Sequence, residues 1–397
     1  MPRRCCGSGC TCLGCSSVSS CPRPRQSPCP VRPSDCARAW PRSSGDRPVV
    51  DRRPPLVYGR RGGPPSRADE VVKSIKIIGT GRYLPEKIVT NDDLAERMET
   101  SDDWIRDRTG IRARRVVAPD VATSHLAARA IAAACTEAGI EPAQLDGIIV
   151  GTCSQDTLFP STACWVQDHL QIRGMPAFDI MAGCSSFLYG LEVAAGWLAG
   201  GPKKHIAVCG AEVFSKILNY DDRRTSVLFG DGAGAAIVTQ AEGDSGVLAS
   251  NWGSDGTLAS ILTVPAGGTR MPASHASVDE RAHTVHMEGG KVFKHAVTAM
   301  SQSLIDAMAE AGLGPEDIDV FIPHQANSRI MEATRERAKI PVEKVFSVLD
   351  KYGNISAASI PVAICEAREK GVLKDGDVLA MTAFGTGLTW AAAVMRW

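Results

Sequence analysis

The sequence predicts a mixed α/β fold built from two copies of one plan. Short β-branched segments alternate with longer helical ones from Ser74 onward, which is the pattern of layered α/β proteins. Residues 138–146 and 311–319 share Ala, Gly, Pro and Asp at one offset of 173 residues. A second echo, Phe-Gly-x-Gly, occurs at 229–232 and at 384–387. Because a repeat constrains the architecture, we expect two halves, residues 73–245 and 246–397.

The individual elements follow from local composition. Residues 74–79 are β-branched enough for a strand, and the Ala-rich residues 126–138 predict a helix that Gly139 ends. Residues 147–151 are the next expected strand. A further strand reaches Cys184 and leads into a mostly apolar stretch, residues 185–198, which is typical of a buried helix. In the second half, residues 320–323 are an expected strand that follows residues 311–319, as residues 147–151 follow residues 138–146 in the first half.

The first 72 residues differ in composition from the rest of the chain. They are rich in Arg, Pro, Ser, Gly and Cys, lack Glu before Glu70, and contain eight of the 14 cysteines. Without apolar periodicity, we expect them to form a disordered extension. This extension is either an organelle transit segment, sequence upstream of a true start near Val72, or a metal-binding tail. Metal binding fits least, because Cys12 and Cys15 have no second pair to complete a four-ligand site.

Bulk composition excludes several classes of function. Lys+Arg and Asp+Glu both number 44, so whole-chain charge gives no argument for nucleic acid or for a membrane surface. The sequence contains no run of eighteen apolar residues, so no membrane span is expected. Single cysteines scattered through the body suit a reducing compartment. We therefore expect a cytoplasmic protein, or a plastid protein if the extension is a transit peptide.

Three polar residues stand at the boundaries of predicted elements. Cys184 lies between a strand and an apolar helix, where the helix N-terminus is expected to lower the thiol pKa. His324 follows a strand, and Asn354 occupies in the second half a place similar to that of Cys184. Singly, they also fit a core cysteine, a core histidine and a helix N-cap. Together they predict a nucleophile with two polar partners, which suits thioester chemistry.

Other motifs allow more than one interpretation. Residues 230–235 match a loose dinucleotide-binding pattern, but the segment that follows has strand length, so we expect a tight β-turn there. Residues 101–112 predict an Asp-capped helix in which Trp104 could stack on an adenine and Arg108 could meet a phosphate. A surface helix with ordinary ion pairs is the alternative. Residues 222–225 could likewise reach a nucleotide or form a solvated loop.

Taken together, these segments resemble the β-ketoacyl-acyl carrier protein synthase III family of the thiolase-like superfamily. The resemblance covers residues 74–397 and implies a five-layered αβαβα fold, a symmetric dimer, and no metal or bound redox cofactor. It rests on residues 101–112, 182–186, 229–236, 324–327, 352–354 and 384–387.

The resemblance also implies a role for individual residues. Cys184 corresponds to the acylated nucleophile, and His324 and Asn354 correspond to the pair that promotes decarboxylation. The backbone N–H groups of Cys184 and Thr386 correspond to the oxyanion donors. The remaining implied contacts are Trp104, Arg108, Thr109 and Arg223 for coenzyme A, Phe159 and Phe384 for the acyl pocket, and Gln325 and Arg329 for carrier-protein docking. The chain departs from the family at Thr386 and Gly290, where the family has Gly and Asn, and at residues 181–183.

The implied function is a decarboxylating condensation of an acyl-CoA primer with malonyl-acyl carrier protein, which begins fatty acid biosynthesis. A related enzyme that makes a specialised 3-oxoacyl or polyketide product from malonyl units remains an alternative. A degradative thiolase would need a second cysteine in residues 384–387, and a hydroxymethylglutaryl-CoA-type synthase would need a glutamate base. A nicotinamide dehydrogenase and a non-catalytic binding protein fit the motifs less well.

Overall fold

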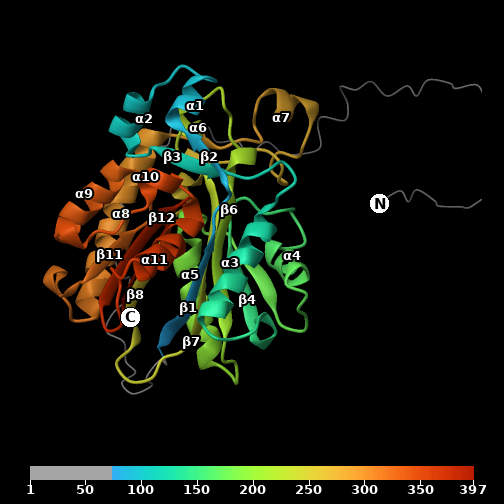
Figure 1. The fold of residues 1–397 in the computed structure, drawn as a ribbon. Coiled ribbons are helices and arrows are strands. Elements are labelled where there is room, and N and C mark those ends of the chain that lie inside the picture. Colours follow the sequence, from blue (N-terminus) through green and yellow to red (C-terminus); the bar gives the residue numbers. More distant parts are fainter. Residues whose placement is uncertain (1–73) are drawn as a thin grey trace, which may run out of the picture. The chain divides into compact units, whose positions relative to one another are not determined.

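The computed structural model describes residues 74–397, and the extension expected over residues 1–72 lies outside the described residues. Two sheets form the framework of the described part (Figure 1). The first contains β1 (Ile75–Tyr83), β4 (Gly147–Gly151), β5 (Ala177–Ile180), β6 (Ile206–Val213) and β7 (Asp231–Gln240). The second contains β8 (Gly246–Ser254), β11 (Val320–Pro323), β12 (Val378–Gly385) and β13 (Thr389–Arg396). Two small ribbons pair β2 (Lys87–Thr90) with β3 (Ala113–Val116), and β9 (Leu262–Thr263) with β10 (His286–Met287).

The two sheets repeat one topology. Their orders are β1-β7-β6-β4-β5 and β8-β13-β12-β11, with the same alternation of antiparallel and parallel neighbours. The place of β5 in the second sheet is taken by a single parallel bridge between Phe321 and Val345. The offset of 173 residues found in the sequence superimposes the start of β4, Gly147, on the start of β11, Val320. The prediction of two repeated α/β halves is therefore confirmed.

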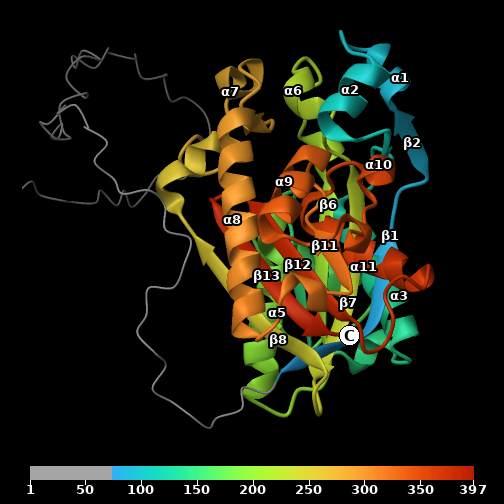
Figure 2. The same cartoon turned by 90° about the vertical axis from the view of Figure 1, so that its left-hand side faces the viewer.

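Helices lie outside both sheets and between them. In the first half, α3 (Thr123–Glu137) and α4 (Thr162–His169) cover the outer face of the sheet, and in the second half α8 (Gly289–Glu310) covers its sheet with α9 (Ser328–Ala338) beside it (Figure 2). The helices α5 (Ser186–Ala199) and α11 (Ser359–Glu369) lie between the sheets. This arrangement is the expected αβαβα layering. The remaining helices are α1 (Asn91–Ala95), α2 (Asp102–Thr109), α6 (Arg223–Ser226), α7 (His275–Asp279) and α10 (Leu349–Tyr352).

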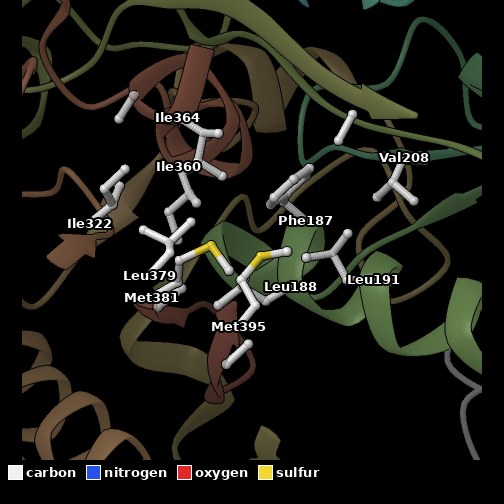
Figure 3. Close-up of a cluster of buried hydrophobic side chains, with 14 of the residues drawn as sticks. Phe187, Leu188, Leu191, Val208, Ile322, Ile360, Ile364, Leu379, Met381 and Met395 are labelled. Carbon is white, nitrogen blue, oxygen red and sulfur yellow. The ribbon is translucent and has the colours of Figure 1, made fainter. Parts of the chain in front are cut away.

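The central layer forms the main hydrophobic core (Figure 3). Its side chains come from both sheets and from both central helices, and each of those labelled in the figure is at most 2% exposed. Full burial of one such side chain stabilises the fold by about 1.5–3 kcal/mol. The core therefore fixes the N-terminal ends of α5 and α11 relative to each other. The labelled residues are Phe187, Leu188, Leu191, Val208, Ile322, Ile360, Ile364, Leu379, Met381 and Met395.

Two local predictions need correction. The cap of α2 is Ser101 and not an aspartate, because the Trp104 N–H donates to Ser101 Oγ at 3.1 Å. Residues 231–235 are not a β-turn but the first part of β7. Their small size serves packing: a Cβ on Gly234 would lie 2.6 Å from the backbone nitrogen of Val362 in α11. The glycines thus allow β7 to approach the central helix closely.

The expected strands 147–151 and 320–323 have the bounds of β4 and β11. The expected helix 126–138 begins three residues earlier, at Thr123. Among the residues that the structure describes, no helix combines the length and the hydropathy that a membrane span requires.

Candidate active site

Cys184 lies in a single 3₁₀ turn, Gly183–Ser185, between β5 and α5. Gly183 has φ +59°, a left-handed conformation that glycine adopts at little cost. The turn is closed by hydrogen bonds: Ser186 Oγ donates to Gly183 O at 2.7 Å, and Thr389 Oγ1 of β13 donates to Ala182 O at 2.6 Å. The cysteine of the first half is thus held by a strand of the second half.

The turn that carries Cys184 packs directly on the end of β12. A Cβ on Gly385 would lie 2.5 Å from the backbone nitrogen of Cys184. Thr386, which replaces the glycine expected from the family, is accommodated because its hydroxyl donates to Leu262 O. The backbone nitrogen atoms of Cys184 and Thr386 therefore both lie where the turn packs on the end of β12.

His324 follows β11 directly. Its backbone N–H donates to Thr382 O at 2.8 Å, which extends the pairing of β11 with β12. The side chain is 1% exposed. Its Nδ1 lies 2.7 Å from Ser359 Oγ, and no described residue hydrogen-bonds its Nε2. Burial lowers the pKa of His324 to about 3, so the imidazole is neutral at physiological pH.

Asn354 precedes the 3₁₀ turn that leads into α11. Its backbone is fixed by two hydrogen bonds, from its N–H to Leu228 O at 2.8 Å and from the Gly230 N–H to its carbonyl at 3.1 Å. Its side-chain Oδ1 accepts the Ser356 N–H at 2.8 Å. Since the oxygen is occupied in this way, the amide N–H groups are the part of the side chain available to a ligand.

One pocket brings the three polar residues together. It has a volume of about 280 Å³, and Cys184, His324 and Asn354 all line it. Exposed Arg108 and half-buried Trp104 also line it, as do Thr109 and buried Phe384. The other lining residues are Arg224, Val227, Leu228, Phe229, Leu262, Met287, Gly289, Val292, Phe293, Ala296, Met300, Ala326, Asn327 and Ile330.

The electrostatics of Cys184 differ from the sequence-based expectation. Burial raises the pKa of its thiol to about 12, and the carboxyl group of Glu212 adds to the increase. The prediction of a lowered pKa was wrong for this structure, because α5 begins only at Ser186 and desolvation outweighs the helix terminus. The Cys184 thiol is therefore protonated near neutral pH.

A tryptophan in the wall of the pocket, Trp104, is flanked by two arginines. The guanidinium carbons of Arg108 and Arg223 lie 4.6 and 4.8 Å from the centre of the Trp104 ring. The helix that carries Trp104 is attached to the second half, because Asn327 Nδ2 donates to Arg108 O at 2.9 Å. Two cations are thus held near the pocket, although Arg224 rather than Arg223 is in its wall.

Not every residue implied by the resemblance reaches this site. Gln325 is fully buried: its Oε1 accepts the Val348 N–H at 3.0 Å, and its Nε2 donates to Pro323 O at 2.5 Å. It supports the loop after β11, so its assignment to carrier-protein docking was wrong. Arg329 is exposed, and it donates to Asp107 O at 2.7 Å. Phe159 is 85% exposed and does not line the pocket of its own chain.

Two residues near the site, Ser359 and Glu212, were not found from the sequence. Ser359 contacts His324. Glu212 is fully buried and accepts hydrogen bonds from the Cys153 N–H at 3.1 Å and from Ser154 Oγ at 2.6 Å. Burial raises the pKa of Glu212 to about 7. No pattern in the sequence marks these positions, because each acts through a contact between segments far apart in the chain. Within residues 74–397, no cluster of three or more His, Cys, Asp or Glu residues could hold a metal ion.

Comparison with known proteins gives a consistent picture. Residues 178–256 match the family described as 3-oxoacyl-[acyl-carrier-protein (ACP)] synthase III, and residues 308–397 match the C-terminal family of the same name. A beta-ketoacyl-[acyl-carrier-protein] synthase III from Caldanaerobacter subterraneus subsp. tengcongensis is 52% identical over 321 residues, or 81% of this chain and 97% of the relative. One from Roseiflexus castenholzii is 46% identical, with the same shares covered. The crystal structure of the synthase III from Aquifex aeolicus VF5 has a TM-score of 0.75 at 43% identity and covers 81% of this chain and 100% of that chain.

Proposed function

Because the chain belongs to the 3-oxoacyl-[acyl-carrier-protein] synthase III family, we propose that Cys184, His324 and Asn354 are its catalytic triad. The enzyme is an acyltransferase with a thiolase-like fold, and it performs the condensation that initiates fatty acid synthesis. The observation that supports the triad best is that all three side chains line one pocket, which also reaches Trp104 and Arg108.

In the first half-reaction, the sulfur of Cys184 attacks the carbonyl carbon of an acyl-CoA thioester. The backbone N–H groups of Cys184 and Thr386 stabilise the oxyanion that forms, and one such donor typically contributes about 3–4 kcal/mol. Collapse of this intermediate breaks the bond to the coenzyme A sulfur. The proton of the Cys184 thiol balances the leaving thiolate, so coenzyme A departs as a thiol and the acyl group remains on Cys184.

In the second half-reaction, malonyl-acyl carrier protein enters the same pocket. Neutral His324 and the amide of Asn354 donate to its thioester carbonyl while carbon dioxide leaves. The enolate that results attacks the acyl carbonyl carbon on Cys184, the bond from that carbon to the Cys184 sulfur breaks, and a 3-oxoacyl-acyl carrier protein forms. Cys184 leaves as a thiolate and takes a proton from solvent, which restores the thiol that was deprotonated in the first half-reaction. Phe384 limits the space around the malonyl group. The chemistry uses no metal or bound redox cofactor, since hydrogen bonds alone stabilise the charge that develops on oxygen.

The pocket and its surroundings also support the substrate contacts. Trp104, Arg108 and Arg223 are suited to the adenine and phosphates of coenzyme A, because guanidinium groups bind phosphate in a bidentate manner. Thr109 adjoins them in the pocket wall. For carrier-protein docking we retain only Arg329, which is exposed on α9 close to the end of α2. The relatives are bacterial proteins, which favours the cytoplasm over a plastid as the location.

A homodimer is the proposed assembly. β5 is an edge strand of the first sheet, so it has unpaired backbone groups along one side. Large apolar side chains are exposed near this edge: Leu158, Phe159 and Met181 are 70%, 85% and 65% exposed. Such a cluster is typical of an interface between subunits. In such a dimer we propose, from the resemblance to the family, that Phe159 reaches across the interface to the partner's acyl pocket.

The triad is tested by separating the two half-reactions. The full chain is incubated with a panel of acyl-CoAs, and its intact mass is recorded. We expect a gain of one acyl group that is lost in Cys184→Ala and retained in Cys164→Ala, since Cys164 is an exposed thiol outside the pocket.

The second half-reaction is followed as decarboxylation of malonyl-acyl carrier protein by the acylated enzyme. Asn354→Ala should acquire the acyl group normally but lose condensation by about 10²–10³-fold, the effect typical of one oxyanion donor. Unimpaired condensation by Asn354→Ala would refute the assignment of the triad.

A further inference from the structure

We propose that Ser359 is a positioning residue that fixes the tautomer of His324, so that the Nε2–H bond points into the pocket. The inference rests on the proposed function, in which His324 donates a hydrogen bond to a thioester carbonyl. It concerns the origin of that donor: a neutral imidazole carries one proton, and only the tautomer with the proton on Nε2 can donate into the pocket.

The contact between the two side chains is fully buried. His324 Nδ1 lies 2.7 Å from Ser359 Oγ, and the two residues are 1% and 0% exposed. Ser359 is the first residue of α11, and α11 is held in the central layer by Ile360 and Ile364. His324 is held by its backbone hydrogen bond to Thr382. Both partners are therefore fixed by elements that belong to the core.

The direction of this hydrogen bond follows from a count of protons. Ser359 Oγ also accepts the N–H of Gln325, at 3.4 Å. If His324 carried its proton on Nδ1, the serine oxygen would accept from both neighbours, and its own proton would need a further acceptor. Within the described part of the chain, no such acceptor is found for the Ser359 hydroxyl. A buried hydroxyl without a partner is costly, so the serine donates to Nδ1.

The protonation of the other ring nitrogen, Nε2, follows from that of Nδ1. With Nδ1 as an acceptor, the single proton of the neutral imidazole resides on Nε2. Nε2 is buried and has no hydrogen-bond partner among residues 74–397, and His324 lines the pocket. An unpaired N–H at this position is ready for a substrate oxygen. The reverse tautomer would present a lone pair to that oxygen and would repel it.

The tautomer can be measured directly in the full chain. The ¹⁵N chemical shifts of the histidine rings distinguish a protonated from an unprotonated nitrogen, and the His324 signals are those lost in His324→Gln. We expect Nε2 to be protonated and Nδ1 unprotonated in the unmodified protein. A protonated Nδ1 in this protein would overturn the proposal, whatever the catalytic results.

A kinetic test uses Ser359→Ala, with Ser301→Ala as the matched control. Ser301 is also a buried serine at a helical position, but its hydroxyl donates within α8, to Val297 O at 2.7 Å. We expect Ser359→Ala to form the acyl-enzyme at the normal rate and to decarboxylate malonyl-acyl carrier protein about 10–100-fold more slowly, as for other residues that orient a histidine. The KM for malonyl-acyl carrier protein should stay within about threefold, and Ser301→Ala should match the unmodified enzyme in every step.

Decarboxylation by Ser359→Ala within about threefold of the unmodified rate would also overturn the proposal. A failure of the proposed function gives a different result. In that case the unmodified protein would not form an acyl-enzyme or would not decarboxylate the malonyl substrate, whereas the ¹⁵N measurement would still report the tautomer.

Discussion

Gly183 and Gly385 meet at the seam between the two halves of the chain, and their backbones touch. A Cβ on Gly183 would lie 2.9 Å from the Cα of Gly385 and 2.4 Å from the backbone nitrogen of Thr386. A Cβ on Gly385 would lie 2.5 Å from the backbone nitrogen of Cys184. Neither position has room for a side chain. This contact sets the spacing of the two N–H groups assigned to the oxyanion.

Gly385→Ala should therefore impair both stability and acylation. The added methyl group meets backbone atoms, which cannot move without displacing β12 from the turn around Cys184. We expect the free energy of unfolding to fall by about 1–3 kcal/mol, as for other overpacked sites. The rate of acyl-enzyme formation should fall by about 10²-fold or more, since the oxyanion donors separate. Chemical denaturation and rapid-quench mass spectrometry measure the two effects.

The matched control for this substitution is Gly196→Ala in α5. A Cβ on Gly196 meets no atom within 4 Å, and the position is inside a helix. Alanine should stabilise it by about 0.8–1 kcal/mol, which is the difference in helix propensity, and should leave acylation unchanged. Equal acylation rates for the Gly385→Ala and Gly196→Ala variants would show that the contact does not matter for catalysis.

The buried histidine should make stability depend on pH. In the folded chain the pKa of His324 is about 3, whereas the unfolded chain has the ordinary value of about 6.5. Between these values the unfolded state binds more protons, so the free energy of unfolding falls as the pH falls from 6.5. Between pH 7.5 and 5 this residue should account for a loss of about 2 kcal/mol. Chemical denaturation of the unmodified protein and of His324→Gln at both pH values measures this change in the free energy of unfolding. The change should be about 2 kcal/mol smaller in the variant. An equal change in both proteins would contradict the prediction.

Association of two chains should depend on the apolar cluster near β5. Phe159→Asp places a charge at a side chain that is 85% exposed in the single chain, so it should not impair folding. If two subunits cover this residue, the buried charge should convert a dimer into a monomer. Analytical ultracentrifugation measures the mass. Val342→Asp, which alters an exposed apolar residue of the second half, is the control and should remain dimeric. If the Phe159→Asp variant remained a dimer, the interface along β5 would be excluded.

The sequence was sufficient to predict the framework of this protein. The repeated passage before Gly147 and Val320 predicted two α/β halves, because the repeat has the same spacing from strand to strand in both. The polar residues at element ends, Cys184, His324 and Asn354, were also found, because strand and helix boundaries can be read from apolar runs. The glycines at residues 230–235 were misinterpreted, since their role is close packing of β7 on α11, and packing partners are not visible in one segment.

Side-chain environments were the least predictable feature. The pKa of Cys184 depends on burial by segments that are distant in sequence. The expectation of a lowered pKa considered only the helix that follows Cys184 in the chain, so it missed this burial. Gln325 illustrates the same limit. It follows His324 and was expected to contact a carrier protein, but its side chain is buried and hydrogen-bonded to the backbone of Val348 and Pro323. Ser359 was not predicted, because the hydrogen bond between its hydroxyl and His324 Nδ1 joins residues 35 positions apart.

Coenzyme A affinity should depend on the cations around Trp104. Arg223→Gln removes a guanidinium that lies 4.8 Å from the indole, and we expect the KM for acyl-CoA to rise about tenfold, the effect of one lost charge-assisted hydrogen bond. Arg106→Gln is the control on the same helix, since Arg106 is paired with Asp102 at 3.0 Å and does not line the pocket. Its KM should not change. A similar KM for both variants, from steady-state kinetics at low salt, would argue against a phosphate contact at Arg223.

The reactivity of Cys184 should rise steadily with pH. Since burial raises the thiol pKa to about 12, only about one molecule in 10⁵ carries a thiolate at pH 7. The rate of alkylation by iodoacetamide, measured on the Cys184 peptide by mass spectrometry, should therefore increase about tenfold per pH unit from pH 6 to 9 without a plateau. Cys164→Ala removes the one exposed competing thiol among residues 74–397. A plateau below pH 7 would show instead that the N-terminus of α5 outweighs desolvation. The proposed acylation would then begin from a thiolate already formed, and the proton of coenzyme A would have to come from solvent.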